Sequence, residues 1–174
     1  MDESGLIERC RAEDREAQRQ VFAKTSVRIY RLLLRMTGNP DDAEDLTQET
    51  YVKGFRSFEQ FDGRSAVASW FYRIAVNEAL QFRRRQGTGR LRLQQIAPTQ
   101  PGEAEPTDAD LRIDLEGALA ELPSDERALL LLRYQEEMDY RRISALLDCA
   151  EGTVASRLNR AREKLRGILR KNYG

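Results

Sequence analysis

Short polar and basic side chains lie close together near the carboxyl end of this 174-residue chain. Thr153, Ser156 and Asn159 offer hydroxyl and amide groups that can hydrogen-bond the edges of nucleic-acid bases. The basic side chains among them are Arg157, Arg160, Arg162 and Lys164. Because arginine can bond guanine through two hydrogen bonds or hold a phosphate, the segment predicts a contact with DNA. The alternative is a solvated basic face at the end of a helix.

A helix must position these residues, and the sequence predicts one from Thr153 to about Arg170. Apolar residues at intervals of four, three, four and three define its buried stripe: Val154, Leu158, Ala161, Leu165 and Ile168. Asp139 is expected to cap a short helix over 140–147, and a turn over 148–152 joins the two helices. This order of short helix, tight turn and basic helix is typical of a helix-turn-helix.

A second group of residues is acidic and lies on a helix predicted from Pro40 to about Phe58, with Asn39 as its N-cap. One face of this helix carries Asp45, Gln48, Glu49 and Val52. Acids around one exposed valine suit a basic protein partner and repel DNA. Two alternatives stay open: an ordinary solvated face, or carboxylates that bind Mg²⁺ in a nuclease, although these acids share one helix.

A third group follows the Asp62-Gly63 turn, on a helix predicted over 67–85. The outer face of that helix carries Trp70, Arg73, Asn77 and Arg84. Trp70 lies at the edge of the buried stripe, so packing in the core is an equal alternative for its side chain. The arginines at 83–85 suit a phosphate backbone, but such a run is also common at a solvated helix end.

The formal net charge of the chain is zero, yet its charges form blocks of opposite sign. The net charge is −5 over 41–63, +6 over 64–95, −8 over 96–126 and +6 over 141–174. Such blocks favour a polyanion as partner for some surfaces and a different partner for others. The absence of histidine excludes Ser-His-Asp triads and zinc sites built with imidazole. We therefore expect no catalytic residue, no metal site and no cofactor.

The expected fold class is all-α, because helical periodicities recur and strand patterns are absent. Three of the five prolines lie in a polar stretch at 86–110, which predicts a flexible linker between two small helical domains, 1–85 and 111–174. A helix is expected from Arg15 to Met36, another from Leu111 to Glu121, and Ser124 is expected to cap the next. No apolar run is long enough to cross a membrane, and two distant cysteines give no disulfide framework, so we expect a cytoplasmic protein without membrane insertion.

Two long segments resemble one known family. Residues 122–166, which contain GTVASRLNRAREKL, are similar to region 4 of RNA polymerase sigma factors. Residues 41–85, which begin DDAEDLTQETYVKGF, are similar to region 2 of the extracytoplasmic-function group of the sigma-70 family. The resemblance implies a bacterial transcription initiation factor that has no catalytic activity and acts on core RNA polymerase and promoter DNA.

The resemblance also implies a role for each group of residues. Asp45, Gln48, Glu49 and Val52 match the face that docks on the β′ coiled coil of the polymerase, which is contacted through its β subunits as well. The expected readers of the melted minus-10 strand are Gly63, Arg64, Ser65, Ala66, Trp70, Arg73, Asn77 and Arg84. Thr153 to Lys164 would enter the minus-35 major groove, and an anti-sigma factor is an expected partner. The alternative function is a free-standing helix-turn-helix regulator that binds duplex DNA without polymerase.

Overall fold

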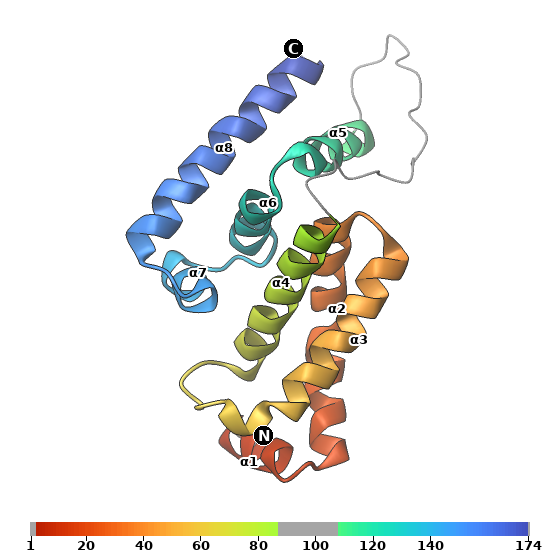
Figure 1. Ribbon diagram of the computed structural model, residues 1–174, viewed down its shortest axis with the longest axis vertical. Helices are drawn as coiled ribbons and strands as arrows, with labels where there is room; N and C mark the ends of the chain where they lie inside the picture. Colours follow the sequence, from red (N-terminus) through yellow and green to blue (C-terminus); the bar gives the residue numbers. More distant parts are fainter. Residues whose placement is uncertain (1–2, 87–107, 174) are drawn as a thin grey trace.

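The computed structural model describes residues 3–86 and 108–173, and every regular element within these ranges is helical (Figure 1). The first domain contains α1 (Glu3–Arg11), α2 (Arg15–Thr37), α3 (Pro40–Arg56), the 3₁₀ turn η1 (Phe58–Gln60) and α4 (Val67–Arg85). The second contains α5 (Asp108–Glu121), α6 (Ser124–Leu130), the π turn η2 (Leu131–Gln135), α7 (Tyr140–Leu147) and α8 (Glu151–Tyr173). The all-α fold class is confirmed, whereas most of the expected linker, 87–107, lies outside the described residues.

Local signals define the ends of the helices in the first domain. Asp14 caps α2 by accepting the amides of Glu16 and Ala17 at 2.8 and 3.2 Å. Gly38 ends α2 in the left-handed conformation, at φ 73°. Asn39 then caps α3 as expected, because its Oδ1 accepts two amides of the first turn at 2.8 and 3.2 Å. The Asn39 prediction is confirmed, while α3 ends two residues earlier than expected.

Helices α2, α3 and α4 form a bundle whose aromatic core lies between α3 and α4. The ring of Phe71 is fully buried, 5.0 Å from the rings of both Tyr51 and Phe55 and 6.3 Å from that of Phe58. The Tyr51 hydroxyl forms a buried 2.6 Å hydrogen bond with Thr25, and burial raises the pKa of Tyr51 to about 12. This cluster fixes the start of α4 against α3, so it positions the third group of site residues.

The second domain closes around a core from α5, α6, α7 and α8. The residues of this core are Leu119, Leu122, Leu129, Leu132, Ile143, Val154, Leu158 and Ala161. Asp139 caps α7 as expected, since its Oδ1 accepts the amide of Arg142 at 2.7 Å. Asp148 ends α7 in the left-handed conformation, at φ 50°, and α8 begins at Glu151. The helix-turn-helix is thus present, with a recognition helix that begins two residues before the expected start.

Two expectations about helix starts were wrong. Ser124 is not an N-cap: it is the first residue of α6, and no side chain caps this helix. The extended backbone of Pro123 takes the cap position, and its carbonyl accepts the amides of Glu126 and Arg127 at 3.0 and 2.9 Å. Helix α5 starts at Asp108, three residues before the expected Leu111, with acids in a first turn where the helix dipole favours them.

Arg127 has a buried charge that joins the two domains. Its side chain is 2% exposed and donates four hydrogen bonds to carbonyls: Leu119 and Ala120 of α5 at 2.7 Å, Leu122 at 2.9 Å and Met36 of α2 at 3.0 Å. Burial, followed by repulsion from Arg83, lowers the pKa of Arg127 to about 10. The acceptors lie at the carboxyl ends of α2 and α5, where helix dipoles favour a cation.

Gly54 gives a test of the packing between α3 and α4. A Cβ at this position would lie 2.7 Å from Cδ1 of the buried Phe71 ring. We expect Gly54→Ala to lower the free energy of unfolding by about 1–3 kcal/mol, because overpacking outweighs the gain in helix propensity. Urea unfolding followed by circular dichroism measures this difference.

The matched control is Gly167→Ala in α8, where an added Cβ meets nothing within 4 Å. This variant should be neutral or up to about 1 kcal/mol more stable than the natural chain. Equal stabilities of the two variants would contradict the close approach at Gly54.

Candidate nucleic-acid interface

Helix α8 presents a polar face to solvent on the side opposite its buried stripe. Val154, Leu158 and Ala161 are buried, whereas Thr153, Ser156, Asn159 and Arg160 are exposed. Within the described ranges, no hydrogen bond or ion pair of the Arg160 side chain is observed. Its guanidinium is therefore available for an external acceptor. We call Thr153, Ser156, Arg157, Asn159, Arg160, Arg162 and Lys164 the recognition set.

The other basic members of the recognition set are held by neighbouring side chains. Lys164 Nζ donates to Glu126 Oε1 of α6 at 2.6 Å, and Arg157 Nη2 lies 3.9 Å from Asp125 Oδ2. Arg162 bonds the Asn159 amide oxygen and also lies 3.5 Å from the Tyr134 hydroxyl. Only part of the basic charge that the sequence places on α8 is therefore free to meet phosphates.

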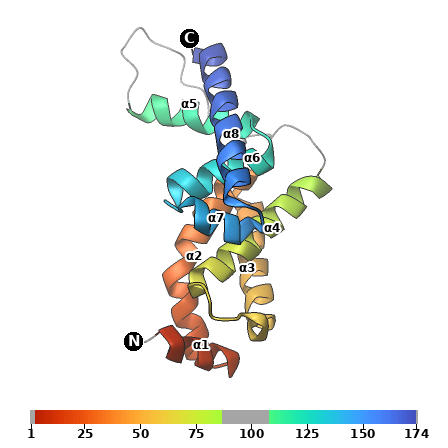
Figure 2. The same ribbon diagram turned by 90° about the vertical axis from the view of Figure 1, so that its left-hand side faces the viewer.

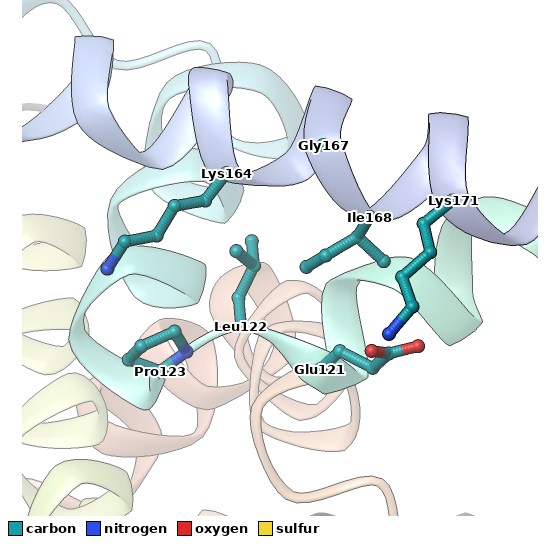
Figure 3. Close-up of a pocket in the computed structure, with 7 residues that line it drawn as sticks. All are labelled: Glu121, Leu122, Pro123, Lys164, Gly167, Ile168 and Lys171. Carbon is teal, nitrogen blue, oxygen red and sulfur yellow. The ribbon is translucent and has the colours of Figure 1, made fainter.

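A shallow hollow between α8 and the α5–α6 corner shows where this inward pull acts. It is lined by Glu121, Leu122, Pro123, Lys164, Gly167, Ile168 and Lys171. Figure 3 shows Lys164 extending from α8 toward α6, and Lys171 pointing toward Glu121. Glu121 also accepts a 2.8 Å hydrogen bond from Asn172. These contacts fix the carboxyl half of α8 on the domain core, so its amino-terminal half is the part that projects.

The loop before α4 is exposed at each of residues 62–66 and is anchored at its two ends. Arg11 of α1 donates to the carbonyl of Phe61 at 2.7 Å, and Asp62 accepts the amide of Arg64 at 3.0 Å. Gly63 adopts φ 74°, a left-handed conformation that favours glycine. The arrangement turns the Arg64 side chain, which is 88% exposed, away from the domain.

On α4, the expected strand-reading residues differ in their surroundings. Asn77 and Arg84 are exposed, and Arg73 is exposed but donates to the carbonyl of Ala145 in α7 at 2.6 Å. Trp70 is partly buried: its Nε1 donates to the Gly54 carbonyl at 3.2 Å and its ring lies 5.7 Å from that of Phe61. Core packing, the alternative considered for Trp70, therefore accounts for much of its side chain. We call the strand-reading face Gly63, Arg64, Ser65, Ala66, Trp70, Arg73, Asn77 and Arg84.

Helix α3 displays the acidic group on its outer surface. Asp45, Gln48 and Glu49 are exposed, and Val52 beside them is 61% exposed. Glu49 lies 3.8 Å from Lys53, which also pairs with Glu78 of α4. We call Asp45, Gln48, Glu49 and Val52 the docking face; the structure brings these residues together as one acidic patch with an apolar centre.

Sequence reasoning missed the residues that connect the two domains. Tyr72 of α4 donates to Glu136, a contact that, together with burial, raises the pKa of the Tyr72 phenol. Arg127 was missed as well, although an arginine at the start of the apolar run 128–132 was a signal of a buried charge. Among residues 3–86 and 108–173, no cluster of three or more acids or cysteines could hold a metal ion, and no helix is long and apolar enough to cross a membrane.

Comparison with known proteins assigns both domains. Residues 21–88 match the family model for Sigma-70 region 2, and residues 112–165 match the model for Sigma-70, region 4. The ECF RNA polymerase sigma factor SigE of Mycolicibacterium smegmatis is 38% identical over 83% of this chain, which spans 58% of that relative. The ECF RNA polymerase sigma-E factor of Haemophilus influenzae is 30% identical over 95% of this chain and 94% of its own length.

Solved structures agree with this assignment. The sigma factor RpoE, from its co-crystal structure with the anti-sigma factor NepR from Bartonella quintana, is 27% identical, with a TM-score of 0.66 over 87% of this chain and 96% of its own. CnrH, solved with the cytosolic domain of CnrY, shares the fold at a TM-score of 0.72 and 21% identity over 97% of both chains. With both regions present in family order, the chain belongs to the extracytoplasmic-function group of RNA polymerase sigma factors, within the sigma-70 family.

Proposed function

We propose that this sigma factor divides promoter recognition among three surfaces. The docking face on α3 binds core RNA polymerase, the strand-reading face binds the melted minus-10 strand, and the recognition set on α8 enters the minus-35 major groove. The observation that supports this division most directly is the exposure of an acidic face on α3 and a basic, amide-bearing face on α8 in one chain. The first repels DNA and the second attracts it.

The docking face suits a basic protein surface such as the β′ coiled coil of the polymerase. Its carboxylates surround the exposed Val52, so a partner can bury an apolar centre within a charged rim. Contacts with the β subunits complete the binding of core polymerase. Like its relatives, which are initiation factors, the chain contributes specificity and leaves the chemistry to the polymerase.

The strand-reading face combines features that single-stranded DNA requires. Asn77 supplies an amide for a base edge, while Arg64 and Arg84 supply charge for phosphates. The exposed loop 63–66 forms the rim of a site that an unstacked base can enter. The partly buried Trp70 supports this rim through Phe61 and offers at most its exposed edge to a base.

The domains and partners follow from these roles. Residues 1–85 form the docking and minus-10 domain, 86–110 the linker, and 111–174 the minus-35 domain, with α5 extending three residues into the linker segment. An anti-sigma factor is a further partner, as in the complex of Bartonella quintana RpoE with NepR. A factor that acts with RNA polymerase on promoter DNA works in the bacterial cytoplasm.

The docking face is tested by charge reversal. Asp45→Lys/Glu49→Lys should weaken the binding of core polymerase about tenfold or more, because like charges then meet across the contact. Pull-down of core polymerase by the full-length chain measures this loss. The control is Glu44→Lys/Glu59→Lys, which makes the same change in net charge at exposed positions outside the docking face. Unchanged binding by the Asp45/Glu49 variant would refute the assignment.

Base reading on α8 is tested with Arg160→Ala. We expect a loss on the order of 1–3 kcal/mol that is confined to one position of the minus-35 element. Run-off transcription by the reconstituted holoenzyme over a randomised promoter library measures this loss. Arg170→Ala, an exposed arginine near the end of the same helix, is the control. An equal loss on all sequences would instead show that Arg160 contacts a phosphate.

Base reading on α4 is tested with Asn77→Ala in the same library. Because an amide that discriminates one base is removed, selectivity should relax at a single minus-10 position while minus-35 selectivity is kept. Gln18→Ala, which removes an amide from α2, is the control. If the minus-10 profile were unaltered, the base reader would have to lie elsewhere in the loop.

A further inference from the structure

The second domain packs on the strand-reading face of the first. Arg73, a member of that face, donates to the carbonyl of Ala145 in α7 at 2.6 Å. The neighbouring Tyr72 donates to Glu136, whose side chain is 4% exposed and also lies 3.9 Å from Arg28 of α2. Figure 2 shows α7 lying against α4, as the contacts require. The first helix of the helix-turn-helix thus occupies the position where a DNA strand along Arg73 would run.

A second set of contacts joins the carboxyl end of α2 to α5, α6 and η2. Arg35 pairs with Glu116 at 2.9 Å and donates to Gln135 at 3.0 Å. The buried Arg127 donates to the carbonyl of Met36 at 3.0 Å. These bonds come from a different helix from those of Tyr72 and Arg73. Together the two sets hold the second domain against both α2 and α4.

The packing is selective about which surfaces it covers. The docking face on α3 stays exposed, and so do Ser156, Asn159 and Arg160 on α8. Helix α8 packs on α5, α6 and α7, which places its polar face outside the contact between the domains. Asn77 is exposed, but it lies one helical turn from Arg73, so a strand that reached both would collide with α7.

We propose that region 4 is an intramolecular cover for the strand-reading face, so that the free chain is closed to single-stranded DNA while its polymerase-docking face stays open. This inference rests on the proposed role of α4. Opening exchanges the contacts of Arg73 and Tyr72 with region 4 for contacts with DNA. The polymerase therefore meets the docking face first, and the strand is read only after region 4 has moved away.

The test uses the free full-length chain with one fluorophore in each domain. Cysteines placed by Lys24→Cys in α2 and Arg170→Cys in α8, both exposed positions, carry the labels after Cys10→Ala and Cys149→Ala. Energy transfer between the labels reports whether the domains are in contact. Fluorescence anisotropy of a single-stranded oligonucleotide of randomised sequence, measured with unlabelled chain, reports strand affinity.

The opening variant is Arg28→Glu/Arg35→Glu, which places like charges opposite Glu136 and Glu116 without touching the strand-reading face. We expect it to lose energy transfer and to bind the strand about tenfold more tightly, as for a chain that is open about one-tenth of the time before the change. This gain would occur although two positive charges are lost. Adding Glu116→Arg to Arg35→Glu should restore energy transfer.

The control is Arg15→Glu/Arg19→Glu, which makes the same charge change at exposed positions near the other end of α2. It should keep energy transfer and gain no strand affinity. Low energy transfer in the unmodified chain, equal to that of the opening variant, would overturn the closed arrangement. Opening without a gain in strand affinity would overturn the cover if Asn77→Ala still relaxed minus-10 selectivity; if Asn77→Ala had no effect either, the role of α4 itself would have failed.

Discussion

The buried guanidinium of Arg127 is the interaction on which the arrangement of the second domain depends. A charge removed from water must be compensated, and here the compensation comes from four backbone carbonyls. Three of them belong to the α5–α6 corner and one to the end of α2, so the same side chain shapes region 4 and fixes it to region 2. Removing the guanidinium would leave all four acceptors without this donor, which is why the corner cannot be repacked independently of α2.

The charged surfaces of the protein follow from the need to bind both a protein and a nucleic acid. Acids cluster on α3, where DNA must be kept away, and basic side chains on α4 and α8, where DNA must be held. In the closed arrangement these opposite surfaces do not neutralise each other. The two domains instead meet through the uncharged carbonyls of Met36 and Ala145 and through the isolated acids Glu116 and Glu136. The main recognition surfaces keep their charge for external partners.

Local features of the fold could be predicted from the sequence because local chemistry determines them. Asn39 and Asp139 were found as caps since a short polar side chain before a helical pattern satisfies the amides of its first turn. Ser124 failed for the same local reason: Pro123 already holds an extended backbone, so the helix starts one residue earlier than a serine cap would allow. The exposure of the docking face likewise followed from the helical period alone.

Contacts between the domains could not be predicted in this way. The acceptor of Arg127 in α2 is 91 residues away in sequence, and Glu136 is 64 residues from Tyr72. Periodicity identifies which face of a helix is buried but not which distant helix covers it. The partial burial of Trp70 was left open by its helical angle and is decided by Gly54, whose missing side chain lets α3 approach α4 closely enough to accept the indole hydrogen bond.

The ion pairs of Arg157 and Lys164 with α6 affect how the protein responds to ionic strength. A basic side chain that leaves a carboxylate to meet a phosphate releases fewer ions overall than one that was free in water. Because Asp125 and Glu126 already neutralise two basic residues of the recognition helix, region 4 alone has a shallow salt dependence and a modest non-specific affinity for DNA. Its residence at a promoter then depends on being tethered to polymerase, where a high local concentration replaces intrinsic affinity.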